Sequence, residues 1–325
     1  RPEWGRGMDV RFARLMNSNQ VVKLRDLNAA FQNPQTINTA YYQASLLVQY
    51  IVDTYGDAGI HKLLRAYGRG LDTDAALQAA LGTDFDQMQT GFDAALERQF
   101  GATRRALEGP KEKVEPQKMS LDELIAYAGQ HPDSYPVQLY LGTMLRKEKR
   151  FDDAMAAFER ASGLVPKAVG QDSPHQQMLA LALEKKDRVR AIRELEAILA
   201  IDFDNIAAAR QLVQLLKEES VADPKRLRPA FERLTALDPF DGGAQASLGR
   251  LALDAGDSET AIRHFKAVVA LKPVDQASAH TDLAESYLKV GRIADARRQT
   301  LAALEVAPSY ERAQTLLLRI AEARP

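Results

Sequence analysis

Apolar and small residues recur in a fixed order through the last two thirds of this chain. The order is a Leu-Gly or Leu-Ala pair, an alanine twelve positions after the pair, a further run of apolar residues, and a proline. The pairs that begin at Leu248 and Leu283 lie 35 positions apart, and so do Ala261 and Ala296. Self-similarity at this period predicts stacked helical hairpins, because one hairpin cannot bury its apolar face alone.

Three copies of the pattern are regular and two are degenerate. The regular copies hold Leu141, Gly142, Ala154, Phe158, Ala161 and Pro166; then Leu248, Gly249, Ala261, Phe265, Val268 and Pro273; and last Leu283, Ala284, Tyr287, Ala296, Ala303 and Pro308. The degenerate copies hold Ala191, Leu195 and Ile198, and then Leu227, Phe231, Leu234 and Pro239. Their wider spacing predicts longer loops at residues 170–174 and 218–224, which are rich in turn-forming residues.

The size of the residue at each position predicts how the helices pack. We expect Gly142 and Gly249 where the two helices of a hairpin cross closely, since a larger side chain would separate the backbones. We expect Phe158 and Phe265 to fill the wider gap to the next hairpin. Each proline should end a helix, because proline lacks an N–H and clashes with the preceding turn.

These residues resemble the tetratricopeptide repeat (TPR) family over residues 119–325. The resemblance implies an all-α fold, a superhelical solenoid of about five helical hairpins preceded by a small helical domain. Residues 120–130 are expected to be the second helix of an incomplete leading repeat. Residues 309–323 are expected to be a capping helix, with Ala313, Leu316, Leu317 and Ile320 on its buried stripe.

Residues 1–101 lack the repeat pattern and predict a separate helical domain. Apolar spacing predicts a helix over residues 39–55 with Gly56 as its C-terminal cap, and a shorter helix over residues 60–67. We expect Leu47, Val48 and Ile51 of the first helix to pack into this domain.

Two more helices are predicted before the repeats begin. One covers residues 74–81 and stops at Gly82. Thr83 and Asp86 indicate an N-cap for the next, which carries Phe85, Met88, Phe92 and Phe100. Residues 102–118 are charged and contain two prolines, and they are expected to be a linker.

A second resemblance concerns residues 30–100. The run from Ala40 to Ile51, with Tyr55-Gly56 and the helix after it, is similar to the helical segment downstream of the zinc site in gluzincin (peptidase MA-like) metallopeptidases. Tyr41 matches the tyrosine of the family's Tyr-Glu-Lys-Gly motif, whose phenol stabilises the oxyanion formed at zinc. The chain departs from the motif at the next three positions, and the alternative is that Tyr41 and Tyr42 are packing aromatics.

The residues that would bind zinc are missing from the chain itself. A zincin site needs two histidines one helical turn apart, a glutamate between them, and a third ligand further along. The chain has five histidines, and none is followed four positions later by another. The sequence therefore predicts no metal and no cofactor in this chain, and zinc is implied only for the full-length protein by the resemblance.

Composition excludes several classes of partner. The 325 residues carry a net charge of −1, which provides no basic field for nucleic acid. No apolar run approaches the roughly 20 residues that a membrane-spanning helix needs. The chain has no cysteine, and this excludes disulfides and thiolate chemistry.

The TPR resemblance also implies a groove along the first helix of each hairpin, where a protein or peptide would bind. The expected groove-facing residues are Thr143, Arg146, Lys147, Gln176, Arg250, Glu285 and Lys289. Chaperone-type TPR domains place Lys and Asn in this groove to hold a C-terminal carboxylate. Here Leu139, Thr143, Ala246 and Arg250 stand at those positions, which disfavours that ligand.

Three functions remain open from the sequence. The first is a protein-interaction scaffold. The second is the back half of an active gluzincin metallopeptidase whose H-E-x-x-H segment lies upstream of residue 1, and the third is a non-catalytic relative of such an enzyme. The second resemblance implies a bacterial protein of the periplasm or cell surface.

Overall fold

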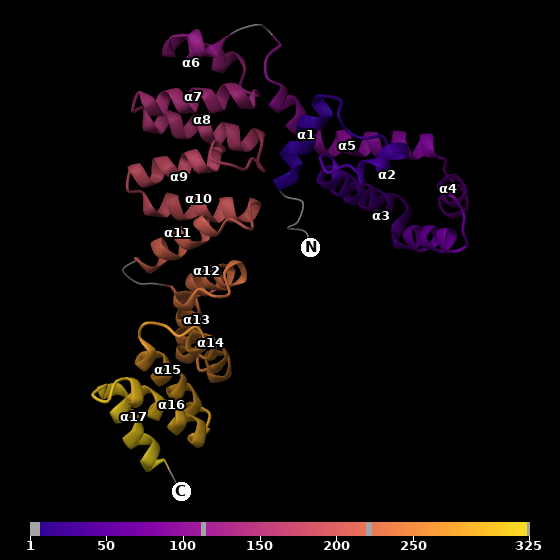
Figure 1. The fold of residues 1–325 in the computed structure, drawn as a ribbon. Helices are drawn as coiled ribbons and strands as arrows, with labels where there is room; N and C mark the ends of the chain where they lie inside the picture. The colour runs from indigo at the N-terminus through magenta and orange to yellow at the C-terminus, as the bar shows by residue number, and fades with distance from the viewer. Residues whose placement is uncertain (1–6, 112–114, 219–222, 324–325) are drawn as a thin grey trace. The chain divides into compact units, whose positions relative to one another are not determined.

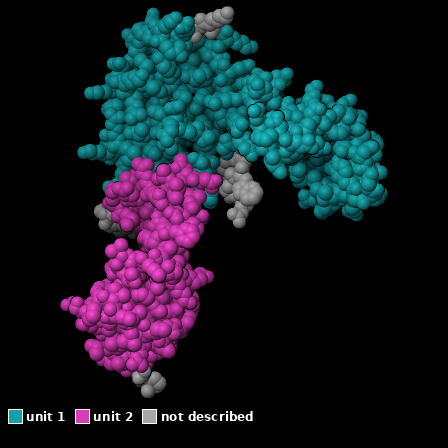
Figure 2. All heavy atoms as spheres, viewed as in Figure 1, with its two compact units in different colours: residues 1–203 teal, residues 204–325 magenta. Residues whose placement is uncertain are grey.

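The computed structural model describes residues 7–111, 115–218 and 223–323, and every regular element in these ranges is a helix (Figure 1). The chain divides into two compact units, residues 1–203 and 204–325 (Figure 2). Unit 1 contains α1 (Asp9–Asn17), η2 (Leu24–Asp26), α2 (Leu27–Ala30), α3 (Ile37–Gly68), α4 (Thr73–Leu81), α5 (Phe85–Glu108), η3 (Pro116–Lys118), α6 (Leu121–Gln130), α7 (Tyr135–Lys147), α8 (Phe151–Leu164), α9 (Pro174–Glu184) and α10 (Arg188–Ile201). Unit 2 contains α11 (Ile206–Lys217), α12 (Pro224–Leu237), α13 (Gly242–Asp254), α14 (Ser258–Ala270), α15 (Gln276–Lys289), α16 (Ile293–Val306) and α17 (Glu311–Glu322).

The repeats form helical hairpins within each unit. We call the first helix of a hairpin helix A and the second helix B. In unit 1, α7 packs on α8 and α9 on α10, with α6 placed before them as the predicted single helix of a leading repeat (Figure 1). In unit 2 the hairpins are α11–α12, α13–α14 and α15–α16. The predicted all-α hairpin fold is confirmed in these residues.

The boundaries of the repeat helices follow local sequence signals. Ser120 caps α6 by a capping box with Glu123, and this box satisfies backbone N–H groups at the start of that helix. α17 begins two residues later and ends one residue earlier than the expected capping helix; it buries Ala313, Leu316 and Ile320, whereas Leu317 is only half-buried. Residues 170–173 of the predicted loop lie between α8 and α9, and Pro174 is the first residue of α9. In the loop expected at 218–224, residues 219–222 lie outside the described ranges.

The turn between helix A and helix B has one backbone geometry in four hairpins. Its central residue has a positive φ: 59° at Lys149, 56° at Lys186, 81° at Gly256 and 73° at Gly291. The next residue donates its N–H to a carbonyl five positions back, as in the hydrogen bond from Asp187 N to Ala182 O (2.8 Å). This pattern is the Schellman motif, which ends helices with a left-handed residue.

One packing expectation covers only part of what Phe158 and Phe265 do, because each ring shares a core with the next hairpin and also fills the crossing within its own hairpin. Phe158 and Phe265 lie over the glycines of their own hairpins, and Gly142 and Gly249 provide the space for the rings. The aromatic ring therefore fills the hairpin crossing itself, because glycine removes the Cβ that would otherwise occupy that volume. Phe158 also borders Met178 and Leu181 of α9 in the same core.

Two boundaries in the N-terminal helices agree with the sequence and one differs. Gly56 interrupts α3 with φ 69° and ψ 174°, and Gly82 ends α4 with φ 67°, as expected of glycine at these positions. The N-cap of α5 is Asp84, not Thr83 or Asp86, because the Asp84 carboxylate accepts the N–H of Gln87 at 2.8 Å.

The linker expected at residues 102–118 begins inside a helix. α5 continues to Glu108, because Ala106 and Leu107 extend its buried stripe. Residues 112–114 lie outside the described ranges. The expected boundary thus falls within unit 1, where α1 and α5 pack on the first hairpin through Val10, Ala106, Tyr135, Ala161, Val165 and Ala168.

Candidate partner-binding groove

The expected groove residues of unit 1 lie on its two A helices, α7 and α9. The Thr143 hydroxyl donates to the Leu139 carbonyl one turn earlier at 2.9 Å, which fixes the Thr143 rotamer. Thr143 lines a groove of about 670 Å³. Gln176 is half-buried on α9 and is not among the residues that line this groove, whereas its neighbour Gln177 is.

The groove joins the A helices to the end of α5. One wall carries Tyr135, Pro136, Leu139 and Tyr140 of α7. The facing residues include Leu107 to Pro110, at and just beyond the end of α5. Tyr127, Pro116 and Val137 complete an apolar and aromatic lining. The groove is therefore built from both the N-terminal helices and the first repeat.

Three charged side chains lie along this groove. Arg14, Glu108 and Asp172 all line it, and none forms an ion pair with another residue in the described part of the chain. Burial raises the pKa of Tyr135, with Arg14 lowering it and Asp172 raising it, so both charges lie close to this phenol. The Tyr135 and Tyr140 hydroxyls have no hydrogen-bond partner among the described residues.

Of the residues that the repeat pattern places along the A helices, Leu139 and Thr143 line this groove. The missed signal is the density of tyrosine and proline between residues 127 and 140, close to the prolines at 110 and 116. The approach of α5 to the first hairpin, which builds the second wall, has no counterpart in the repeat pattern.

The other two expected residues of α7 have different environments. Arg146 donates to Gln177 Oε1 at 3.2 Å and pairs with Glu184 at 3.6 Å, so it ties α7 to α9. Lys147 is exposed at the end of α7.

In unit 2 two of the three expected residues, Arg250 and Glu285, belong to a chain of ion pairs across three helices. The buried carboxylate of Asp282 on α15 receives Arg250 of α13 at 3.3 Å and Arg312 of α17 at 2.8 Å. Arg312 also pairs with Glu285 at 3.3 Å. Lys289 is exposed at the end of α15. Arg250 and Glu285 thus connect neighbouring helices of the unit.

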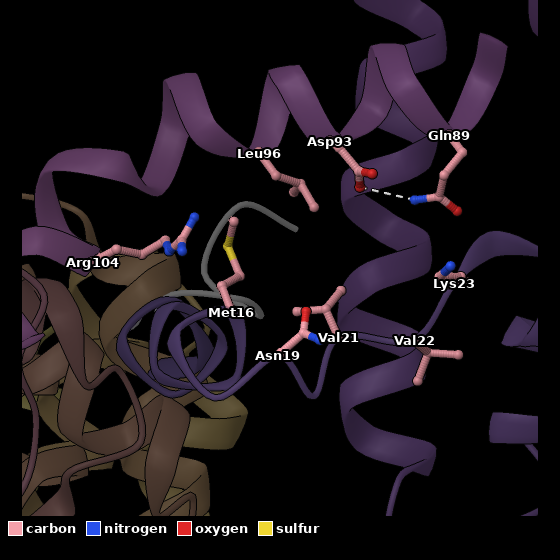
Figure 3. Close-up of a pocket in the computed structure, with 9 residues that line it drawn as sticks. All are labelled: Met16, Asn19, Val21, Val22, Lys23, Gln89, Asp93, Leu96 and Arg104. Carbon is pink, nitrogen blue, oxygen red and sulfur yellow. Dashed lines mark hydrogen bonds between the residues drawn. The ribbon is translucent and has the colours of Figure 1, made fainter. Parts of the chain in front are cut away.

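Two other hollows are smaller. One of about 530 Å³ lies between α11 and α13, over Phe231 and Leu234. The other, of about 260 Å³, lies between α5 and the segment after α1 (Figure 3). In this second hollow the Gln89 amide donates a hydrogen bond to Asp93 at 2.8 Å and accepts one from the N–H of Leu24 at 2.8 Å. Both hydrogen bonds of this amide therefore stabilise the local structure.

Three of the five histidines connect the two helices of a hairpin. His175 lies 2.7 Å from Glu194, His264 lies 2.8 Å from Gln245, and His280 lies 2.7 Å from Gln299. Each pair is separated by 19 positions and joins helix A to helix B. Within the described ranges no three His, Cys, Asp or Glu side chains form a group able to hold a metal ion.

Tyr41 and Tyr42 occupy opposite environments at the start of α3. The Tyr41 side chain is 63% exposed, and its ring meets Phe31 edge-on with centroids 4.9 Å apart. Tyr42 is buried and donates a hydrogen bond to Asp9, which also pairs with Lys167. Further along α3 Ile51 is buried, but Val48 is 51% exposed, so the expectation that Val48 packs into the domain is wrong.

Two parts of the chain match models of a known repeat family. Residues 120–169 and residues 252–320 match models described as tetratricopeptide repeat. The chain therefore carries TPR repeats in both units, as the residue pattern predicted. A search of the curated proteins found no match.

Parts of the chain are similar in structure to solved TPR proteins of low sequence identity. YrrB, described as a TPR protein with an unusual peptide-binding site, is 17% identical with a TM-score of 0.37, over 60% of this chain and 98% of that chain. TTC0263, described as a thermophilic TPR protein in Thermus thermophilus, is 22% identical with a TM-score of 0.30, over 58% and 98%. MamA is 20% identical with a TM-score of 0.34, over 53% and 90%.

Across the described residues, none of the helices combines the length and the apolar character that crossing a membrane would require.

Proposed function

We propose that this chain is a protein-interaction scaffold that binds a peptide or partner protein along the A helices of unit 1. The groove beside Thr143 carries the proposal. Its volume of about 670 Å³ falls within the range of roughly 300–1,000 Å³ usual for ligand sites. It also presents the Tyr135 and Tyr140 hydroxyls and the charged groups of Arg14, Glu108 and Asp172, which have no side-chain partner among the described residues. Helical repeats use such extended faces to hold peptides.

A selection experiment tests this function. Short peptides displayed on phage are selected on the whole chain, and selected peptides are then measured against a Thr143→Lys variant. We expect peptides whose binding is lost in Thr143→Lys and retained in Asp122→Asn, a substitution of an exposed acid on α6 outside the groove. Selected peptides that bind Thr143→Lys as tightly as the wild type would contradict the groove as the binding face.

We also propose, from the gluzincin resemblance of residues 30–100, that the full-length protein is a zinc metallopeptidase in which Tyr41 stabilises the oxyanion. The observation that favours this second function is the exposure of Tyr41 in the first turns of α3. In a longer protein that contains an upstream H-E-x-x-H segment, Tyr41→Phe should lower kcat by roughly 10²- to 10³-fold. Tyr67→Phe, at another exposed tyrosine of α3, is the control. Unchanged kcat in Tyr41→Phe would exclude Tyr41 from the mechanism, and a longer protein without any peptidase activity would leave the non-catalytic relative as the better description.

A further inference from the structure

The groove of unit 1 has a surface chemistry that selects among peptide conformations. Its apolar lining comes from the flat rings of Tyr127, Tyr135 and Tyr140 and from Pro110, Pro116 and Pro136. Aromatic-lined grooves of this kind dock polyproline II segments, because the segment is already extended and loses little conformational entropy on binding. The lining therefore favours an extended ligand that is rich in proline.

The hydroxyl groups point to the same kind of ligand. Tyr135 and Tyr140 each have a phenol without a hydrogen-bond partner among the described residues. A polyproline II segment has no internal hydrogen bonds, so its carbonyls are free to accept from these phenols. A helical ligand satisfies its carbonyls internally and would leave both phenols unpaired.

The charges select the side chain that accompanies the prolines. Glu108 and Asp172 provide two negative charges beside the groove and Arg14 provides one positive charge, which leaves an excess of one negative charge. Since none of the three is paired within the described ranges, a basic side chain on the ligand would complement the excess.

We propose that the groove between α7 and the end of α5 binds an extended, proline-rich peptide that carries a lysine or arginine. This inference rests on the proposed scaffold function and narrows its ligand to one class. The N-terminal helices then have a binding role, since α1 and α5 supply Arg14 and Glu108 and the segment after α5 supplies Pro110.

Fluorescence anisotropy on the whole chain tests the proposal. The probe is a labelled, end-blocked proline-rich peptide with one arginine. Its comparison peptides are the same sequence with glutamate in place of arginine, a Gly-Ser peptide with one arginine, and an alanine-rich helical peptide with one arginine. We expect the arginine-bearing proline peptide to bind more tightly than all three.

Variants of the chain locate the binding. Tyr140→Ala should weaken the proline peptide about tenfold or more, in keeping with tyrosine as a binding hot spot. Tyr140→Phe keeps the packing ring and should lose only the hydroxyl's share, so it remains informative if Tyr140→Ala unfolds. Glu108→Gln with Asp172→Asn should weaken binding by up to about fivefold, as for exposed charge pairs. Asp122→Asn and Tyr67→Ala lie outside the groove and should not change binding.

The outcomes separate this inference from the scaffold function. Equal binding of the arginine and glutamate peptides, or full binding by both Tyr140 variants, would overturn the inference. If the proline peptides fail to bind while a phage-selected peptide still depends on Thr143, the ligand class is wrong and the scaffold function stands. If no peptide of any class depends on Thr143, both proposals fail.

Discussion

Gly142 lies against the ring of Phe158, which crosses it from the second helix of the same hairpin. A methyl group built at Gly142 would stand 2.6 Å from Cε1 of that ring, and the same group at Gly249 would stand 2.7 Å from Cε1 of Phe265. Both distances are far shorter than an ordinary carbon–carbon contact of about 3.5–4.0 Å. The glycine and the aromatic residue therefore act as one packing unit in two separate repeats.

Gly142→Ala should destabilise unit 1. Alanine favours the helix by about 0.5–1 kcal/mol, but overpacking a close-packed site costs about 1–3 kcal/mol. Gly163→Ala in α8 of the same hairpin is the matched control, because a methyl group there meets nothing within 4 Å. The control should be stabilised by roughly 0.5–1 kcal/mol. Urea unfolding of both variants measures the difference, and equal midpoints would show that the ring can move away.

Phe158→Ala should cost about 3–5 kcal/mol of unfolding free energy, the usual range for a fully buried aromatic residue. The two positions should also be coupled. Phe158→Leu in the Gly142→Ala background should cost less than in the wild type, since the smaller side chain leaves room for the methyl group. A double-mutant cycle with strictly additive free energies would contradict this contact.

Lys149→Gly should stabilise unit 1. Lys149 has φ 59° in the turn between α7 and α8, a conformation that costs a residue with a Cβ about 1–2 kcal/mol. Glycine removes this strain but adds chain entropy to the unfolded state, so we expect a net gain of up to about 1 kcal/mol. The reverse change, Gly256→Ala in the equivalent turn of unit 2, should destabilise. Thermal unfolding of the two variants should shift the melting temperature in opposite directions.

Tyr42→Phe should destabilise unit 1 while Tyr41→Phe should leave it unchanged. The buried Tyr42 phenol donates a hydrogen bond to Asp9. Burial raises the pKa of Tyr42, and the Asp9 carboxylate raises it further, so the phenol stays protonated. Losing a hydrogen bond to a charged group costs about 1.5–3 kcal/mol. Tyr41 is exposed, and removal of its hydroxyl should fall within about 0.5 kcal/mol. A similar loss in both variants would mean that α3 is rotated from the orientation described.

Unit 2 should lose stability as the pH falls below about 6.5, the ordinary value for histidine. Burial lowers the pKa of His264, Arg263 and Arg228 lower it further, and Glu232 and Asp257 oppose them. In the window below the ordinary value the unfolded chain binds more protons at this position than the folded unit does, so stability rises with pH. In His264→Gln the unfolding midpoint should depend less on pH across this range than it does in the wild type. An NMR titration midpoint for His264 above the ordinary value would reverse the expected slope.

The repeat core could be predicted from the sequence because its period and residue sizes are dictated by helix packing. Ala154, Phe158 and Ala161 are completely buried, as their spacing required. The partner of Phe158 was not predictable from spacing alone, because the same ring could fill either the crossing within a hairpin or the gap to the next.

The groove could not be predicted from the sequence, because it forms by tertiary packing between helices and the repeat pattern carries no information on that packing. Tyr127, Tyr140 and Glu108 lie on three different helices, and they line one groove because Ala106 of α5 packs beside Tyr135 of α7. The sequence did not predict that α5 extends through Ala106 to Glu108, because the charged residues and nearby prolines at its end are typical of a linker.

The shared carboxylate of Asp282 has a consequence for what the face of unit 2 can recognise. Arg250 and Arg312 stand on this face as cations, yet each already has a counter-ion within the fold. Arg250, Arg312, Asp282 and Glu285 together carry two positive and two negative charges, so this cluster presents no net charge to an approaching acidic molecule. The two carboxylates thus offset the attraction that Arg250 and Arg312 alone would have for polyanions. This face keeps two exposed guanidinium groups without becoming a general site for acidic ligands.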